Sequence, residues 1–194
     1  MAENTTLRSI KRWLWKDEGK IPNADVFSRL YEDTHLIVFR YIYGLIGGPL
    51  QEVEDLTAET YARAWKAHHR FAGDEQATLG WLLRIARNLV IDLSRRHKTR
   101  DTDENISIEL LVDPAQIPEA DVITREQIAI LWKMLGMLNT DVREMLVLRY
   151  MLGWQVRRIA GYLGMNENTV TVTIKRALKN LQRDWPQSQE QDHE

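Results

Sequence analysis

The chain has 194 residues, of which 44% are hydrophobic; it carries a formal net charge of −2 and contains no cysteine. The length fits one or two small domains with packed cores, and the absence of cysteine excludes disulfides and thiolate metal sites. The small net charge conceals segments of opposite charge. Residues 84–100 sum to +5, residues 101–124 to −7 without any Lys or Arg, and residues 125–185 to +5. Such blocks indicate separate surfaces with separate partners, although solvated faces around an acidic linker would give the same pattern.

Residues 1–23 form an N-terminal extension in which Trp13 and Trp15 lie among basic residues. Its apolar stretch is too short for a secretory signal. The longest apolar run, residues 36–46, is interrupted by Arg40 and is too short to span a bilayer. We therefore expect a soluble, cytoplasmic protein without membrane insertion. The extension is interpreted either as an added packing segment, which we prefer, or as an amphipathic helix that binds a partner.

Helical periodicity predicts an all-α protein of two small helical domains joined by a flexible acidic linker. The first domain, residues 24–100, should contain helices over 24–45, 49–68 and 77–98, with a loop at 71–76. Pro49 suits the first turn of the second helix, where acidic residues follow it. Residues 101–123 contain two prolines, lack a sustained period and are predicted to be the linker.

The second domain, residues 124–185, should begin with a helix over 124–137 and end with a helix-turn-helix over 155–184. Between them, Asn139, Thr140 or Asp141 caps a helix that Gly153 ends, and Asp141 and Glu144 have the spacing of a capping box. Residues 186–194 are polar and are expected to be a disordered tail.

The helix-turn-helix is predicted from a turn at Gly164, an N-cap at Asn166 and a two-sided final helix. One face of that helix carries Asn168, Thr171, Lys175 and Lys179, and the opposite face carries Val170, Ile174, Ala177, Leu178 and Leu181. This pattern suits a recognition helix in a DNA groove, where an exposed Val172 could touch a thymine methyl group. A helical hairpin inside a bundle is the alternative.

Two further faces suggest binding surfaces. The helix over 77–98 carries a basic stripe of Arg84, Arg87, Asn88, Ile91, Arg95 and Lys98 opposite Leu79, Leu82, Leu83, Ala86, Leu89, Val90 and Leu93. The stripe could neutralise phosphates, and Trp81 and Phe71 could stack on unpaired bases. In the alternative, the arginines only keep the surface soluble and Trp81 belongs to the core. The helix over 49–68 has a polar side of Glu52, Asp55, Glu59 and Arg63, for which a plain Glu59–Arg63 surface ion pair is the alternative.

Enzyme signatures are lacking in the sequence. It contains no glycine-rich phosphate loop, no nucleophile elbow, no helical histidine pair for a metal and no carboxylate cluster for metal ions. We therefore expect no catalytic residues, no metal and no cofactor.

Residues 55–65 (DLTAETYARAW) and 80–89 (GWLLRIARNL) resemble region 2 of bacterial extracytoplasmic-function (ECF) sigma factors. Residues 141–152 (DVREMLVLRYML), with Ile159-Ala160 and Asn168-Thr169-Val170, resemble region 4 of the same family. The two matches have the order and spacing of the family over residues 26–181. The resemblance implies a sigma factor without catalytic activity, which binds core RNA polymerase and promoter DNA and directs promoter recognition, DNA opening and initiation. It also implies an anti-sigma factor as a partner and a linker that enters the active-site channel of the polymerase.

The resemblance assigns three sets of residues. Polymerase docking is assigned to Glu52, Asp55, Leu56, Glu59 and Arg63. The minus-ten element is assigned to the loop at 71–76 and to Phe71, Trp81, Arg84, Arg87, Asn88, Arg95, Arg96 and Lys98. The minus-thirty-five element is assigned to Asn168, Thr169, Thr171, Val172, Lys175, Arg176, Lys179, Arg157 and Arg158.

The chain departs from the family at three places. Ala58 stands where Gln is usual, and Thr-Val-Thr at residues 171–173 replaces the usual Lys, Ser and Arg. Arg157 and Arg158 replace two acids. We expect an unusual or weakly held promoter sequence, with both arginines adding phosphate contacts.

Two other functions remain open at the level of the sequence. A stand-alone helix-turn-helix regulator would bind duplex DNA without polymerase and would not need the face around Asp55 and Glu59. A protein that sequesters another regulator would bind neither DNA nor polymerase, and its basic faces would tolerate substitution.

Overall fold

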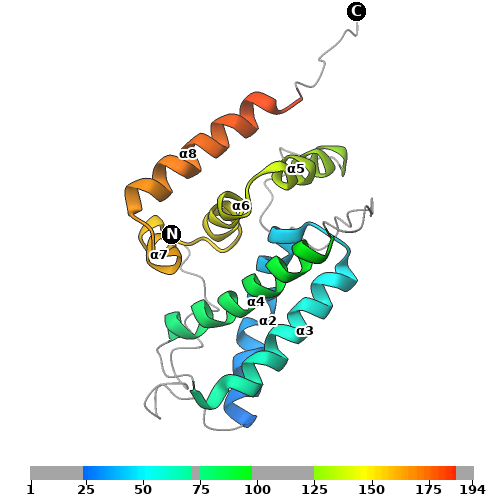
Figure 1. The fold of residues 1–194 in the computed structure, drawn as a ribbon, viewed down its shortest axis with the longest axis vertical. Coiled ribbons are helices and arrows are strands. Elements are labelled where there is room, and N and C mark those ends of the chain that lie inside the picture. The colour runs from blue at the N-terminus through cyan, green and yellow to red at the C-terminus, as the bar shows by residue number, and fades with distance from the viewer. Residues whose placement is uncertain (1–23, 71–74, 98–124, 187–194) are drawn as a thin grey trace, which may run out of the picture. The chain divides into compact units, whose positions relative to one another are not determined.

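A computed structural model of the chain describes residues 24–70, 75–97 and 125–186 (Figure 1). Every regular element within these ranges is a helix, which confirms the predicted all-α class. The described residues divide into two compact units, unit 1 within Met1–Leu111 and unit 2 within Val112–Glu194. The predicted N-terminal extension, the linker and residues 187–194 of the predicted tail lie outside the described residues.

Unit 1 is a bundle of three helices, α2 (Ala24–Ile46), α3 (Leu50–Ala67) and α4 (Glu75–His97), with a 3₁₀ turn η2 (His68–Arg70) after α3. Each of the three helices packs against the other two (Figure 1). The helices begin and end within two residues of the predicted bounds, since their apolar faces and the intervening turn residues mark both ends.

The turn between α2 and α3 depends on a glycine and a proline. Gly47 has a φ of +60°, a conformation open to glycine at little steric cost, and its N–H donates to the Tyr43 carbonyl at 2.7 Å. Pro49 is the N-cap residue, with φ −56° and ψ 140°, and α3 begins at Leu50. The prediction that Pro49 lies in the first turn was therefore wrong by one position.

The core of unit 1 is apolar with a few hydrogen-bonded hydroxyl groups. Thr34 Oγ1 lies 2.7 Å from the Tyr61 hydroxyl and also donates to the Leu30 carbonyl at 2.5 Å. Thr57 and Thr60 donate to carbonyls one turn earlier on α3, each at 2.7 Å. These pairings let buried threonines pack between helices without an unsatisfied polar group. The buried apolar side chains of α2 are Leu30, Val38, Tyr41, Ile42, Tyr43 and Leu45.

Unit 2 contains α5 (Arg125–Met137), α6 (Thr140–Leu146), a π-helical turn η4 (Val147–Met151), α7 (Val156–Leu163) and α8 (Glu167–Asp184). α8 packs against α6 and α7 (Figure 1). The single helix predicted before Gly153 is thus α6 continued by η4. Gly153 follows it with a φ of +66°, as expected for a residue that ends a helix.

Asn139 is the residue that caps α6, because its side-chain oxygen accepts from the Asp141 N–H at 2.9 Å. The capping box predicted from Asp141 and Glu144 was wrong. Asp141 lies inside the first turn of α6, and Glu144 is buried with 0% exposure rather than turned back to the helix start.

The predicted turn of the helix-turn-helix is confirmed. Gly164 ends α7 in the left-handed region at φ +67°, and Asn166 caps α8 by accepting from the Asn168 N–H at 2.8 Å. On α8, Val170, Ile174 and Ala177 are buried and Leu181 is half-buried. Leu178, which we expected on the apolar face, is 39% exposed because the covered arc of α8 is narrower than the apolar stripe in the sequence.

Candidate nucleic-acid and partner interfaces

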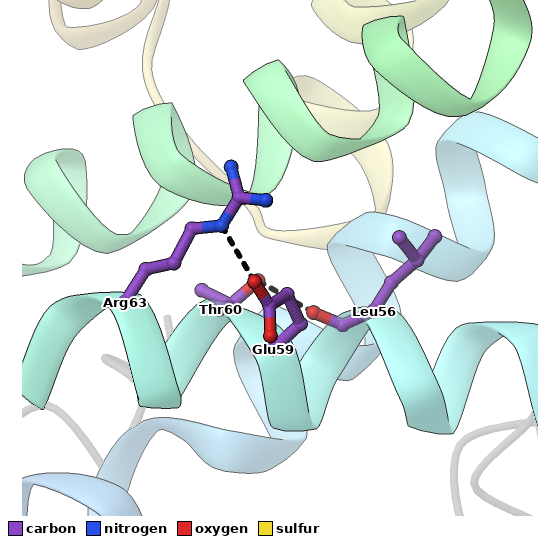
Figure 2. A network of polar contacts seen from close by, with 4 residues as sticks. All are labelled: Leu56, Glu59, Thr60 and Arg63. Carbon is purple, nitrogen blue, oxygen red and sulfur yellow. Dashed lines mark hydrogen bonds and ion pairs between the residues drawn. The ribbon is translucent and has the colours of Figure 1, made fainter.

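The charged side of α3 is exposed as the sequence predicted. Asp55, Glu59 and Arg63 are exposed, and Glu52 is half-buried. Arg63 Nε donates to Glu59 Oε1 at 2.7 Å, so the ion pair foreseen as the plain alternative does form (Figure 2). The hydrogen bond from Arg63 lowers the pKa of Glu59, and the positive charges of Arg63 and Lys66 act in the same direction. An exposed pair of this kind contributes little to stability, which leaves both groups available to a partner.

Leu56 lies at the edge between this charged side and the core. Its side chain is half-buried, and its carbonyl accepts from Thr60 Oγ1 at 2.7 Å (Figure 2). Gln51 Nε2 donates to Asp55 Oδ1 at 3.2 Å one turn earlier. The five residues assigned to docking therefore form one strip of α3 with an apolar margin.

The polar side of α4 is basic and largely exposed. Arg84, Asn88, Arg95 and Arg96 are exposed, whereas Arg87 and Trp81 are half-buried. Trp81 is thus neither a fully buried core residue nor a fully open stacking platform. The opposite side is buried at Leu79, Leu82, Leu83, Ala86, Leu89 and Val90, and half-buried at Leu93. Phe71, Lys98 and residues 71–74 of the predicted loop lie outside the described residues, and the last two residues of that loop, 75–76, belong instead to α4.

One acid lies beside the basic stripe of α4. Arg95 Nη1 is 4.0 Å from Asp92 Oδ1, a weak and exposed contact. Such a pair is easily exchanged for a phosphate, because little energy holds it. The stripe therefore keeps a positive surface despite its acidic neighbour.

The outer face of α8 is polar and cationic. Asn168, Thr169, Lys175, Arg176 and Lys179 are exposed. Thr171 is half-buried, and its hydroxyl already donates to the Glu167 carbonyl at 2.9 Å. Val172, expected to be exposed, is half-buried, so that only part of its side chain can touch a ligand.

The two arginines of α7 differ in environment. Arg157 is exposed, whereas Arg158 is half-buried and its guanidinium carbon lies 3.8 Å from the centroid of the Trp154 ring. Trp154 itself is only 4% exposed. Trp154 was not among the site residues predicted from the sequence. The spacing of an aromatic residue and an arginine at positions i and i+4 was the available signal.

No group of three or more His, Asp or Glu residues within the described ranges could hold a metal ion. Nor does any helix in those ranges combine the length and apolar character needed to cross a membrane.

Both units match known protein families. Residues 30–100 match sigma-70 region 2, and residues 128–181 match sigma-70 region 4. The chain is 32% identical over 173 residues to the ECF RNA polymerase sigma factor BldN of Streptomyces coelicolor, covering 88% of this chain but only 64% of that relative. It is also 32% identical over 142 residues to the RNA polymerase sigma factor CnrH of Cupriavidus metallidurans, covering 70% of this chain and 74% of CnrH.

The fold is similar to that of the sigma factor RpoE from Bartonella quintana, solved in complex with the anti-sigma factor NepR. The TM-score is 0.61 at 23% identity, over 82% of this chain and 96% of RpoE. A stand-alone helix-turn-helix regulator is not favoured, because the match to region 2 in unit 1 has no place in such a protein. With regions 2 and 4 both present in the order that the family requires, the chain belongs to the ECF RNA polymerase sigma factors.

Proposed function

We propose that this chain binds core RNA polymerase in the cytoplasm and directs it to promoters, where it recognises and opens the DNA and initiates transcription without catalysis of its own. The observation that carries the proposal is the presence of regions 2 and 4 on separate compact units of one chain. In this proposal residues 24–100 serve polymerase docking and the minus-ten element, and residues 124–185 serve the minus-thirty-five element.

The polymerase-docking surface in this proposal is the exposed strip of α3. It offers two acids, Asp55 and Glu59, beside the half-buried Leu56. Burying the Glu59–Arg63 pair under a partner would strengthen it, since charge pairs gain from a lower dielectric when both partners stay hydrogen-bonded. Charged rims around an apolar contact also speed association and select the partner.

The DNA-binding surfaces in this proposal are the basic side of α4 and the outer face of α8. The exposed Arg84, Arg95 and Arg96 supply phosphate contacts for the minus-ten element, and the half-buried Trp81 stacks on an unpaired base. On α8, Lys175 and Lys179 contact the phosphates of the DNA backbone, while Asn168 reaches base edges in the major groove. The short side chains at residues 171–173 reduce the charge of this face, which favours a promoter sequence unlike that of most relatives.

A protein inhibitor is the second partner in this proposal. The related fold of RpoE is known in complex with the anti-sigma factor NepR. The proposed docking strip of α3 is largely exposed, and an inhibitor that covers it would keep the chain from the polymerase.

Co-purification with core RNA polymerase tests the docking surface. The double substitution Asp55→Arg with Glu59→Arg reverses two charges on the proposed strip and should reduce retention of core enzyme at least tenfold, or about 1.4 kcal/mol. The charge-matched control, Glu32→Arg with Glu54→Arg, changes two exposed acids outside the strip and should bind like the wild type.

Equal loss in both double variants would show that net charge, rather than this strip, governs docking. A folded wild type that fails to retain core enzyme, yet binds duplex DNA tightly by itself, would revive the stand-alone regulator and reject the sigma function.

A further inference from the structure

Trp154 is the centre of a buried cluster at the entry to the helix-turn-helix. It follows η4 and precedes α7, and its backbone N–H donates to the Leu148 carbonyl at 2.9 Å. Arg149 Nη1 donates to the Trp154 carbonyl at 2.9 Å, and the Tyr162 ring meets the indole edge-on at 5.5 Å. The Arg158 guanidinium covers the indole face at 3.8 Å. Two groups from η4 thus hold the backbone of Trp154, and two groups from α7 hold its ring.

The arrangement of Arg158 is that of a cation–π contact at short range. A guanidinium within about 6 Å of an indole centroid is attracted by the ring quadrupole, more strongly where water is excluded. Trp154 is 4% exposed, and Arg158 is half-buried over it. The stacking fixes the orientation of the Arg158 guanidinium, so that turning it towards a phosphate elsewhere would cost the contact with the indole.

Arg157 is free of that constraint. It is exposed, and among the described residues it forms no ion pair or ring contact. Successive helical residues point about 100° apart, so that Arg157 faces solvent while Arg158 faces Trp154. Two adjacent arginines that look equivalent in the sequence therefore have different surroundings.

We infer that Arg158 is a positioning residue, which clamps Trp154 and so sets the start of α7, and that Arg157 alone makes the phosphate contact in this turn. The part concerning DNA rests on the proposed sigma function; the clamp does not. This assignment divides the roles that the sequence ascribed to both arginines. The clamp also explains how the charge of Arg158 is tolerated in the first turn of α7, where the helix dipole favours acids instead.

Fluorine NMR of the full chain labelled with 5-fluorotryptophan tests the clamp. The chain has seven tryptophans, and the resonance that disappears in Trp154→Phe identifies the relevant one. Arg158→Met keeps an apolar chain over the ring but removes the charge; it should shift this resonance and lower the thermal midpoint. The matched Arg157→Met should change neither. An unmoved Trp154 resonance in Arg158→Met would overturn the clamp.

The salt dependence of DNA binding tests the division of roles. Holoenzyme assembled from core polymerase and the full chain is titrated with a duplex that it has selected from a randomised library. Arg157→Met should lower the slope of log K against log [salt] by about one, and Arg158→Met should leave it unchanged. Equal losses in both variants, or a loss in Arg158→Met alone, would overturn the division. If the wild-type holoenzyme selects no DNA, the sigma function fails, while the NMR result still decides the clamp.

Discussion

At the scale of single residues, the contact between Thr34 and Tyr61 shows how the core of unit 1 combines apolar packing with a specific polar link. The two hydroxyl oxygens are 2.7 Å apart and join α2 to α3. Burial raises the pKa of Tyr61 well above its ordinary value, although the hydrogen bond with Thr34 opposes the shift. The neutral phenol is therefore the form that the folded unit requires.

Replacing Tyr61 by Phe should cost about 1 kcal/mol of unfolding free energy at neutral pH, since one buried hydrogen bond is lost. In the wild type the contribution of Tyr61 to stability is complete below pH ~10 and declines above it, because the phenol of the unfolded chain ionises first. Tyr61→Phe should therefore flatten the alkaline loss of stability. Denaturant titrations from pH 7 to 11 measure both effects.

Tyr150→Phe is the control for this prediction, because Tyr150 is 59% exposed and lies in unit 2. An identical alkaline decline in wild type and Tyr61→Phe would show that another group is responsible. Tyr43, whose pKa burial also raises, would be the next tyrosine to test.

At the scale of elements, the helix-turn-helix depends on how α7 stops and α8 starts. The left-handed backbone of Gly164 turns the chain, and the Asn166 side chain then satisfies an amide at the start of α8. An added Cβ at Gly164 would meet no atom within 4 Å, so that the φ of +67°, rather than lack of space, favours glycine there. Gly161, inside α7, likewise has open space around it but ordinary helical geometry.

The two glycines give a matched pair of alanine substitutions with opposite expected signs. Gly164→Ala should destabilise unit 2 by about 1 kcal/mol, because alanine is strained at positive φ. Gly161→Ala should stabilise it by about 0.5–1 kcal/mol, because alanine is the better helix former. Thermal melts of the two variants measure the difference, and a shift of both midpoints in the same direction would contradict this account of the turn.

At the scale of the whole molecule, the chain consists of two compact units with separate cores. Ile42 in α2 and Ile159 in α7 are each 0% exposed and belong to different cores. Compact units with cores of their own can fold alone, and a two-state description of the full chain then fails. Separate folding suits the proposed function, in which each unit meets a different promoter element.

Matched Ile→Val substitutions test this independence. Ile42→Val and Ile159→Val should each cost about 0.5–1.5 kcal/mol, because each removes one buried methylene group. Calorimetry of the full chain should show two transitions, with each variant lowering only the transition of its own unit. If either substitution lowers both transitions equally, the units are coupled and unfold together.

The sequence by itself determined the helices, the turn of the helix-turn-helix and the family. The spacing of apolar residues indicates which face of a helix packs on a core. Caps such as Asn166 and turn glycines such as Gly164 act through local geometry, which the sequence specifies directly. The motifs at residues 55–65 and 141–152 lie within the segments that match regions 2 and 4. The individual DNA-binding and polymerase-binding residues remain predictions.

Only the tertiary structure decided how far each apolar face is covered and which neighbours a side chain meets. Leu178 has apolar spacing but stays 39% exposed, while Glu144, expected at a helix start, is fully buried. The stacking of Arg158 on Trp154 depends on the path of the chain between η4 and α7. The physical reason is that periodicity specifies a direction around one helix, whereas burial depends on which other elements occupy that direction.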